Sequence, residues 1–120
     1  MAALTYNQMV VELELSDGDV DRIFRALADR TRRDIVRRTI EAEQSVSTLA
    51  ATYDISFAAV QKHVAVLEAA QLVVKRAEGR ERLVRANPAT LARARRLLAD
   101  YERMWRARVD RLDDLLAEDL

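Results

Sequence analysis

The sequence predicts a mainly α-helical protein with one small β-hairpin, in the order α-α-α-α-β-β-α. Apolar residues recur at helical spacing between residues 20 and 67, two short segments rich in Val and Leu flank Gly79, and an apolar stripe follows over residues 91–116. The 120 residues suit one compact domain, and a composition of 50% hydrophobic and 33% charged residues is typical of a globular protein.

Composition excludes several kinds of site. The chain has no cysteine, so it can form neither a disulfide nor a thiolate metal site. No apolar run reaches the roughly 18 residues of a membrane span, and the N-terminus lacks the basic and apolar segments of a signal peptide. We therefore expect a cytoplasmic protein that has no membrane partner.

The chain divides into an N-terminal arm over residues 1–18, a body over residues 19–87 and a C-terminal helix over residues 88–120. In the arm, apolar residues alternate with glutamates over residues 11–15. This alternation fits a strand, while the residue types also suit a helix. The sequence leaves both possibilities open.

The body begins with two predicted amphipathic helices. Asp29 separates them, because its carboxylate can accept hydrogen bonds from the free backbone N–H groups at the start of the second helix. The apolar faces consist of Val20, Ile23, Phe24, Leu27 and Ala28 in the first helix, and of Ile35, Val36 and Ile40 in the second.

Two further helices follow, and Ser45 and Ser56 can cap their N-termini. They are joined around Asp54 and Ile55 by about three or four residues, which is the length of the link in a helix-turn-helix. The side chains expected to face the core are Leu49, Ala50 and Tyr53 in the third helix, and Val60, Val64 and Leu67 in the fourth.

Residues 72–77 and 81–86 form a predicted β-hairpin, because both segments are rich in Val and Leu and Gly79 between them can adopt a positive φ. Asn87 can cap the last helix, and Pro88 fits its first position. This last helix is predicted to run to the end of the chain.

The outer face of the fourth helix carries residues suited to DNA recognition. The second helix of a helix-turn-helix enters the major groove, where Gln61 can pair with adenine and Lys62 can reach guanine or phosphate. Serine caps can offer hydroxyl groups or helix-end amides to phosphates. The alternative is that these are only polar residues on a solvated helix. The expected DNA-facing residues are Ser45, Ser56, Phe57, Ala58, Gln61 and Lys62.

The predicted hairpin is strongly basic, since five of the eleven residues 75–85 are Lys or Arg. Residues 56–87 carry six basic and three acidic groups, in a chain whose net charge is zero. A basic hairpin after a helix-turn-helix can act as a wing that contacts phosphates or the minor groove, whereas a solvated charged hairpin is the alternative. Arg85 can equally pair with an internal carboxylate. The DNA contacts are assigned to Arg76, Arg80 and Arg82.

The single histidine, His63, lies beside this surface. A metal role would need further ligands that the sequence does not supply, so packing, phosphate contact or a link between helices is expected, and His63 is counted among the DNA-binding candidates. We expect no bound metal and no cofactor. No nucleophile–base pair, phosphate loop or paired carboxylate motif is present, so an enzyme is not expected.

The last helix has apolar residues at spacings of three and four, as in a coiled coil. A helix about 45 Å long, at 1.5 Å per residue, is longer than so small a body can cover. The stripe therefore predicts a homodimer seam. Its members are Leu91, Leu98, Tyr101, Trp105, Val109, Leu112 and Leu116, with Ala94 on the same face.

The chain resembles the ArsR-type winged helix-turn-helix repressors over about residues 19–116. This resemblance implies a homodimeric repressor that binds a palindromic operator in double-stranded DNA. The motifs that carry it are residues 24–33 (FRALADRTRR), 45–50 (SVSTLA), 59–68 (AVQKHVAVLE), 70–73 (AQLV) and 79–82 (GRER), with Tyr101 and Trp105.

Two substitutions depart from the family pattern. Arg30 replaces a usual proline, and Gln71 replaces a usual glycine, so Gln71 is expected to adopt a strained left-handed conformation. The third helix lacks the cysteines, and the last helix the histidines, of the metal-sensing members, so metal sensing is not expected.

Two functional classes remain open on the sequence. The first is a DNA-binding repressor, and the second is a winged-helix module that binds another protein without specific DNA binding. Retarded migration of a palindromic DNA fragment would distinguish them. The sequence does not specify an effector molecule.

Overall fold

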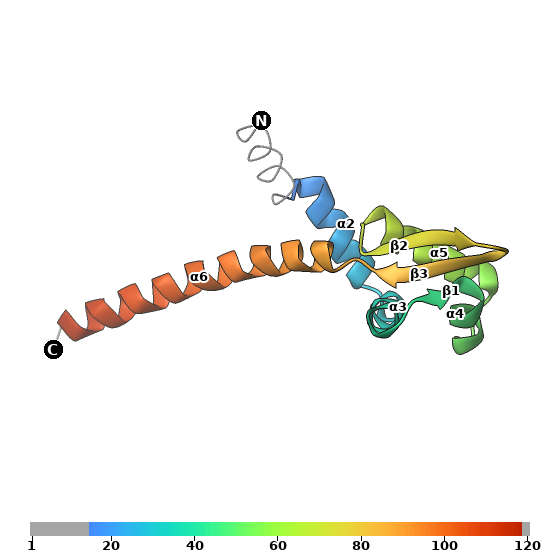
Figure 1. Cartoon of the computed structure of the whole chain (residues 1–120). Coiled ribbons are helices and arrows are strands. Elements are labelled where there is room, and N and C mark those ends of the chain that lie inside the picture. The colour runs from blue at the N-terminus through green and yellow to red at the C-terminus, as the bar shows by residue number, and fades with distance from the viewer. Residues whose placement is uncertain (1–14, 119–120) are drawn as a thin grey trace, which may run out of the picture.

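Helices and a small sheet form a body from which the last helix projects (Figure 1). The computed structural model describes residues 15–118, so all but the last residue of the predicted alternation at 11–15 lies outside the described residues. The predicted mainly helical fold with a hairpin and a long C-terminal helix is confirmed. In chain order the elements are α2 (Asp17–Leu27), α3 (Arg30–Glu41), β1 (Gln44–Ser45), α4 (Val46–Thr52), α5 (Phe57–Ala69), β2 (Val73–Glu78), β3 (Glu81–Ala86) and α6 (Pro88–Glu118).

Side-chain caps determine where the helices of the body begin. Asp29, Ser45 and Ser56 each accept a hydrogen bond from the backbone N–H three residues later, at 3.0, 3.0 and 3.1 Å, as predicted. These bonds satisfy donors that have no partner inside the helix. Helix α2 begins with a capping box between Ser16 and Asp19 that the sequence analysis missed. The helix therefore includes the last two residues of the predicted arm.

The sheet has three strands in the order β1-β3-β2, one more than the predicted hairpin. Strands β2 and β3 form the hairpin, and Gly79 in its turn has a φ of 60°. Strand β1 is only two residues long, too short for a periodic sequence signal, and it exists because the segment after α3 lies along β3. Its antiparallel register pairs Gln44 with Val84 and Ser45 with Leu83.

Helix α5 ends in a Schellman motif centred on Gln71. The N–H of Leu72 donates to the carbonyl of Leu67, and the N–H of Gln71 donates to the carbonyl of Glu68, both at 2.9 Å. Gln71 has a φ of 60°, which confirms the expected left-handed conformation. Leu67 and Leu72 are both fully buried, so the end of α5 packs into the core.

One core lies between the helices and the inner face of the sheet. Three expectations about its members are wrong: Phe24 is 40% exposed, Ile40 is 58% exposed and Ala28 is also exposed, although helical spacing placed all three on apolar faces. These side chains are exposed because the apolar faces of α2 and α3 are wider than the surfaces with which the two helices contact the rest of the body. The largest fully buried apolar side chains are Ile23, Ile35, Leu49, Val60, Val64, Leu67, Leu72, Val73 and Val84.

The first turns of α6 are attached to the body. The N–H of Asn87 donates to the carbonyl of Leu72 at 2.9 Å, and the buried hydroxyl of Thr90 donates to the carbonyl of Gln71 at 2.6 Å. Ala94 is buried in the core. These contacts fix the direction in which α6 leaves the end of α5.

Beyond Ala94, α6 projects away from the body, and its free end and the hairpin tip lie at opposite ends of the molecule (Figure 1). Among residues 15–118, none of the helices combines the length and the hydropathy that a membrane span requires. Leu91, which we predicted in a dimer seam, instead packs partly buried against the core of its own chain. The large apolar side chains that α6 exposes are Leu98, Tyr101, Met104, Trp105, Leu112, Leu115 and Leu116.

Candidate nucleic-acid interface

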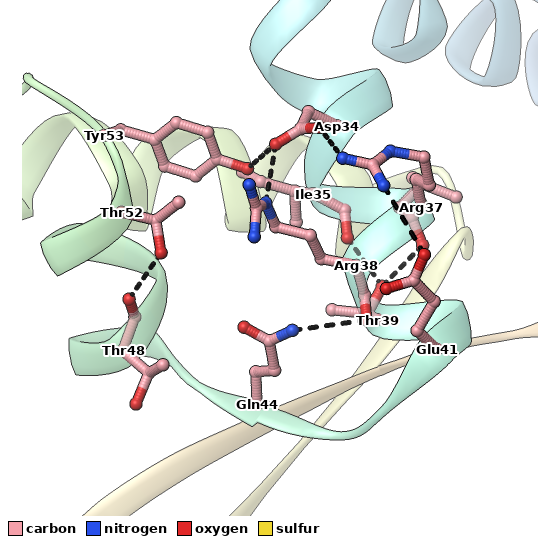
Figure 2. Close-up of polar contacts among 11 residues, drawn as sticks. Asp34, Ile35, Arg37, Arg38, Thr39, Glu41, Gln44, Thr48, Thr52 and Tyr53 are labelled. Carbon is pink, nitrogen blue, oxygen red and sulfur yellow. Dashed lines mark hydrogen bonds and ion pairs between the residues drawn. The ribbon is translucent and has the colours of Figure 1, made fainter.

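A polar cluster joins α3 to the end of α4 and so positions the helix-turn-helix (Figure 2). The Tyr53 hydroxyl donates to Asp34 Oδ2 at 2.5 Å. Arg38 Nε donates to the same oxygen at 2.8 Å, and Arg37 Nη2 donates to Asp34 Oδ1 at 2.6 Å. Gln44 Nε2 donates to the backbone carbonyl of Arg38 at 3.3 Å. One carboxylate thus holds groups from both helices.

The cluster changes the ionisation of its members. Hydrogen bonds from Tyr53, Arg38 and Arg37 hold the pKa of Asp34 well below its usual range. Burial, together with the hydrogen bond to Asp34, raises the pKa of Tyr53 to about 12. The tyrosine therefore stays protonated and the aspartate ionised over a wide range of pH.

Helix α5 presents the face that a recognition helix requires. Val60, Val64 and Leu67 are buried, as predicted from their spacing. The opposite face is exposed to solvent and bears both apolar and polar groups. Its residues at the N-terminal half of the helix are Phe57, Ala58, Gln61 and Lys62.

The two serine caps differ in accessibility. Ser56 is exposed at the start of α5, where its hydroxyl accepts from the N–H of Ala59. Ser45 is only 7% exposed, and its hydroxyl is engaged with both the N–H and the hydroxyl of Thr48. Of the two groups expected to meet phosphates at this cap, the hydroxyl and the helix-end amides, the structure therefore does not present the Ser45 hydroxyl.

His63 lies where α5 meets the start of α3 and the end of α2. Its Nδ1 is 3.3 Å from a guanidinium nitrogen of Arg32 and 3.9 Å from the carboxylate of Asp29. The same guanidinium donates to the backbone carbonyls of Arg25 and Ala26 at 3.0 and 2.8 Å. Of the three roles considered for His63, this geometry corresponds to the link between helices.

The hairpin divides its arginines between two environments. Arg76 donates twice to the carboxylate of Glu43, at 3.0 and 2.6 Å, and it also pairs with Glu78 at 3.1 Å. The bonds from Arg76 lower the pKa of Glu43. Arg80 and Arg82 are exposed at the tip and form no ion pair with any of residues 15–118. Arg85, near the base of β3, is also exposed and forms no ion pair with a described residue, so the accessible arginines lie both near the tip and at the base of the hairpin.

Sequence reasoning missed the arginine cluster of α3, in which five of the nine residues 30–38 are arginine. Four of them, Arg30, Arg33, Arg37 and Arg38, line a groove of about 570 Å³ between α3 and the end of α4. The spacing of Asp34 with Arg37 and Arg38 is a signal for ion pairs within a helix. The hydrogen bond from Tyr53 joins residues nineteen positions apart. A pair so far apart in the chain leaves no pattern in the sequence.

Among residues 15–118, no group of three or more histidines, aspartates or glutamates is arranged to hold a metal ion.

Comparison with known proteins identifies the class. A family model described as a helix-turn-helix domain matches residues 27–76. The HTH-type transcriptional regulator Rv2034 of Mycobacterium tuberculosis is 40% identical over 85 residues, which cover 71% of this chain and 77% of that protein.

Solved structures agree with this match. An ArsR-like transcriptional regulator from Rhodococcus sp. RHA1 superposes with a TM-score of 0.74 at 33% identity, covering 82% of this chain and 92% of the other. The homodimeric winged helix-turn-helix DNA-binding domain Mb0332 from Mycobacterium bovis has the same fold, with a TM-score of 0.59 at 20% identity over 74% of this chain and 89% of its own.

The exposed recognition helix, the basic hairpin and these relatives together define a DNA-binding transcriptional regulator of the winged helix-turn-helix class. Within that class, the chain belongs to the ArsR family.

Proposed function

We propose that the protein is a homodimeric repressor that binds a palindromic operator. The observation that carries this proposal is the separation of two surfaces. The outer face of α5 and the hairpin tip belong to the body, whereas the apolar stripe of α6 lies beyond it (Figure 1). One surface suits DNA and the other suits a second copy of the chain, so both can be occupied together.

The dimer is supported by the exposure of α6. Tyr101 and Trp105 are 58% and 65% exposed, and Leu112 and Leu116 are 50% and 65% exposed further along the stripe. Apolar surface of this extent on one helix face indicates a partner, and the spacing of three and four residues favours another helix. The homodimeric Mycobacterium bovis domain shares this fold. The seam then begins near Leu98, after the point where α6 leaves its own core.

The palindrome follows from two-fold symmetry. A symmetric dimer would present two α5 helices to successive major grooves, with half-site centres about 34 Å apart, one turn of DNA. Gln61 then pairs with a base edge, and Lys62 reaches guanine or phosphate. Arg80 and Arg82 contact phosphates or the minor groove beside the site.

Repression would follow from occupation of the promoter by the bound dimer, which agrees with the family resemblance. Because DNA is the partner, we assign the protein to the cytoplasm.

Selection of binding sites from a random DNA pool with the full chain tests this proposal. We expect a consensus with two inverted half-sites about 10 base pairs apart, centre to centre. Recovery of no consensus, with equal affinity for selected and scrambled duplexes, would contradict it and would favour the protein-binding alternative.

A further inference from the structure

Two large apolar side chains are exposed where the chain enters α5. Ile55 is 41% exposed in the turn, and Phe57 is 48% exposed at the first position of the helix. Neither belongs to the core formed by the described residues, whereas Val60, Val64 and Leu67 of the same helix do. Because exposed phenyl groups gain free energy from burial, Phe57 is suited to contact an apolar group on a partner.

The neighbours of Phe57 along the chain are apolar or uncharged rather than basic. Ala58 follows it, Ser56 precedes it, and the nearest charge before it is the carboxylate of Asp54, which repels phosphate. The first cation on the outer face of α5 is Lys62, more than one turn later. Phe57 itself is therefore poorly suited to the DNA backbone and better suited to the edge of a base.

Gln61 lies one helical turn after Phe57, so the two side chains are neighbours on the outer face. In the major groove, an A·T pair offers the N6 and N7 atoms of adenine, which suit a glutamine amide, and the C5-methyl group of thymine, which suits an apolar side chain. The combination of a phenyl group and an amide at these neighbouring positions matches the two features.

We propose that Phe57 contacts the C5-methyl group of a thymine in each operator half-site, and that this methyl group is part of the recognised sequence. The inference rests on the proposed function, because it requires α5 to lie in the major groove. It adds a specificity determinant that is independent of hydrogen bonding. Each half-site then contains a thymine whose methyl group is removed from water when the protein binds.

The test uses the full chain and the duplex obtained by selection from a random pool. Each thymine of the half-site is replaced in turn, in both halves of the palindrome, by deoxyuridine, which keeps its base pairing but lacks the methyl group. At one thymine we expect about fourfold weaker binding for each half-site altered, the effect of burying one methyl group. Phe57→Ala should bind the thymine and deoxyuridine duplexes with equal affinity.

Two matched variants locate the effect. Ile55→Ala removes a similarly exposed side chain two residues earlier, and Gln61→Ala removes the neighbouring amide; both should retain the sensitivity to deoxyuridine. Circular dichroism and affinity for scrambled DNA test whether each variant is folded. Because all three side chains are exposed, we expect each substitution to leave the fold intact.

The inference is overturned if no thymine replacement weakens binding by the wild-type protein. It is equally overturned if Phe57→Ala keeps the sensitivity, or if Ile55→Ala loses it. In each of these cases a selected consensus and its preference over scrambled DNA would persist, so the proposed function would stand. Absence of any consensus would instead contradict the proposed function itself.

Discussion

Tyr53 and Asp34, nineteen residues apart in the chain, form a hydrogen bond of 2.5 Å between the end of α4 and the middle of α3. Tyr53 is the residue at which α4 ends and the turn into α5 begins. The bond therefore fixes the turn of the helix-turn-helix against the helix behind it (Figure 2).

Replacement of Tyr53 by phenylalanine should lower the free energy of unfolding by about 1 kcal/mol, because the variant cannot form this hydrogen bond while its ring remains. Urea denaturation at neutral pH measures this change. Thr52→Ala is the control, since the Thr52 hydroxyl bonds only to the carbonyl of Thr48 in its own helix. A Tyr53→Phe protein as stable as the wild type would show that the bond contributes nothing.

The same pair predicts the dependence of stability on pH. The folded-state pKa of Asp34 is depressed, so its contribution is present above its ordinary pKa of about 4 and is lost as the pH falls further. The folded-state pKa of Tyr53 is raised to about 12, so its contribution is present below its ordinary pKa of 10.0 and is lost as the pH rises through about 12. The stability difference between wild type and Tyr53→Phe should therefore be largest at intermediate pH. A difference that is constant from acid to alkaline pH would contradict this account.

Gln71→Gly should stabilise the protein by up to about 1 kcal/mol, because glycine adopts a left-handed conformation without the steric cost that other residues pay. Gln71→Ala is the matched control: it keeps the strained φ of 60° and should change stability little. Thermal unfolding of the three proteins in parallel compares them. A glycine variant less stable than the wild type would mean that the Gln71 side chain stabilises the end of α5 by more than its left-handed backbone conformation destabilises it.

Sequence patterns predicted the helices and the hairpin because their signals are local. Asp29, Ser45 and Ser56 cap the expected helices, and Gln71 has the expected conformation. Strand β1 could not be predicted, since a pair of residues has no period and their pairing with β3 is created by tertiary packing.

The candidate site was harder to predict because a side chain's availability depends on partners distant in sequence. Arg76 looked equivalent to Arg80 in the sequence, but it contacts Glu43, which lies more than thirty residues before it. For His63 the sequence left three roles open, and only its contact with Arg32, similarly distant in the chain, distinguishes between them. The stripe of α6 likewise did not reveal that Leu91 packs on its own core.

Trp105→Glu should convert a dimer into a monomer, because it puts a carboxylate in the middle of the apolar stripe. Ala107→Glu is the control, since position 107 lies on the opposite side of the same helix from Trp105. Light scattering at micromolar concentration should give twice 13.7 kDa for the wild type and the control, and 13.7 kDa for Trp105→Glu. An unchanged dimer mass for Trp105→Glu would exclude this seam.

Arg80→Ala should weaken binding to operator and to scrambled DNA by similar factors, because Arg80 is expected to act through the phosphate field. The dependence of affinity on salt should become shallower by about one unit for each phosphate that the variant no longer neutralises. Arg76→Ala is the matched control, since Arg76 is already paired with Glu43 and Glu78. Identical salt dependence for the wild type and Arg80→Ala would mean that the hairpin tip does not contact DNA.

The affinity of Gln61→Ala for the selected operator and for scrambled DNA tests whether α5 reads DNA sequence. We predict a loss of about 1–3 kcal/mol on the operator, because a base contact is removed. On scrambled DNA the affinity should remain close to that of the wild type. An equal loss on both duplexes, or no loss on either, would contradict the assignment of α5 as the recognition helix.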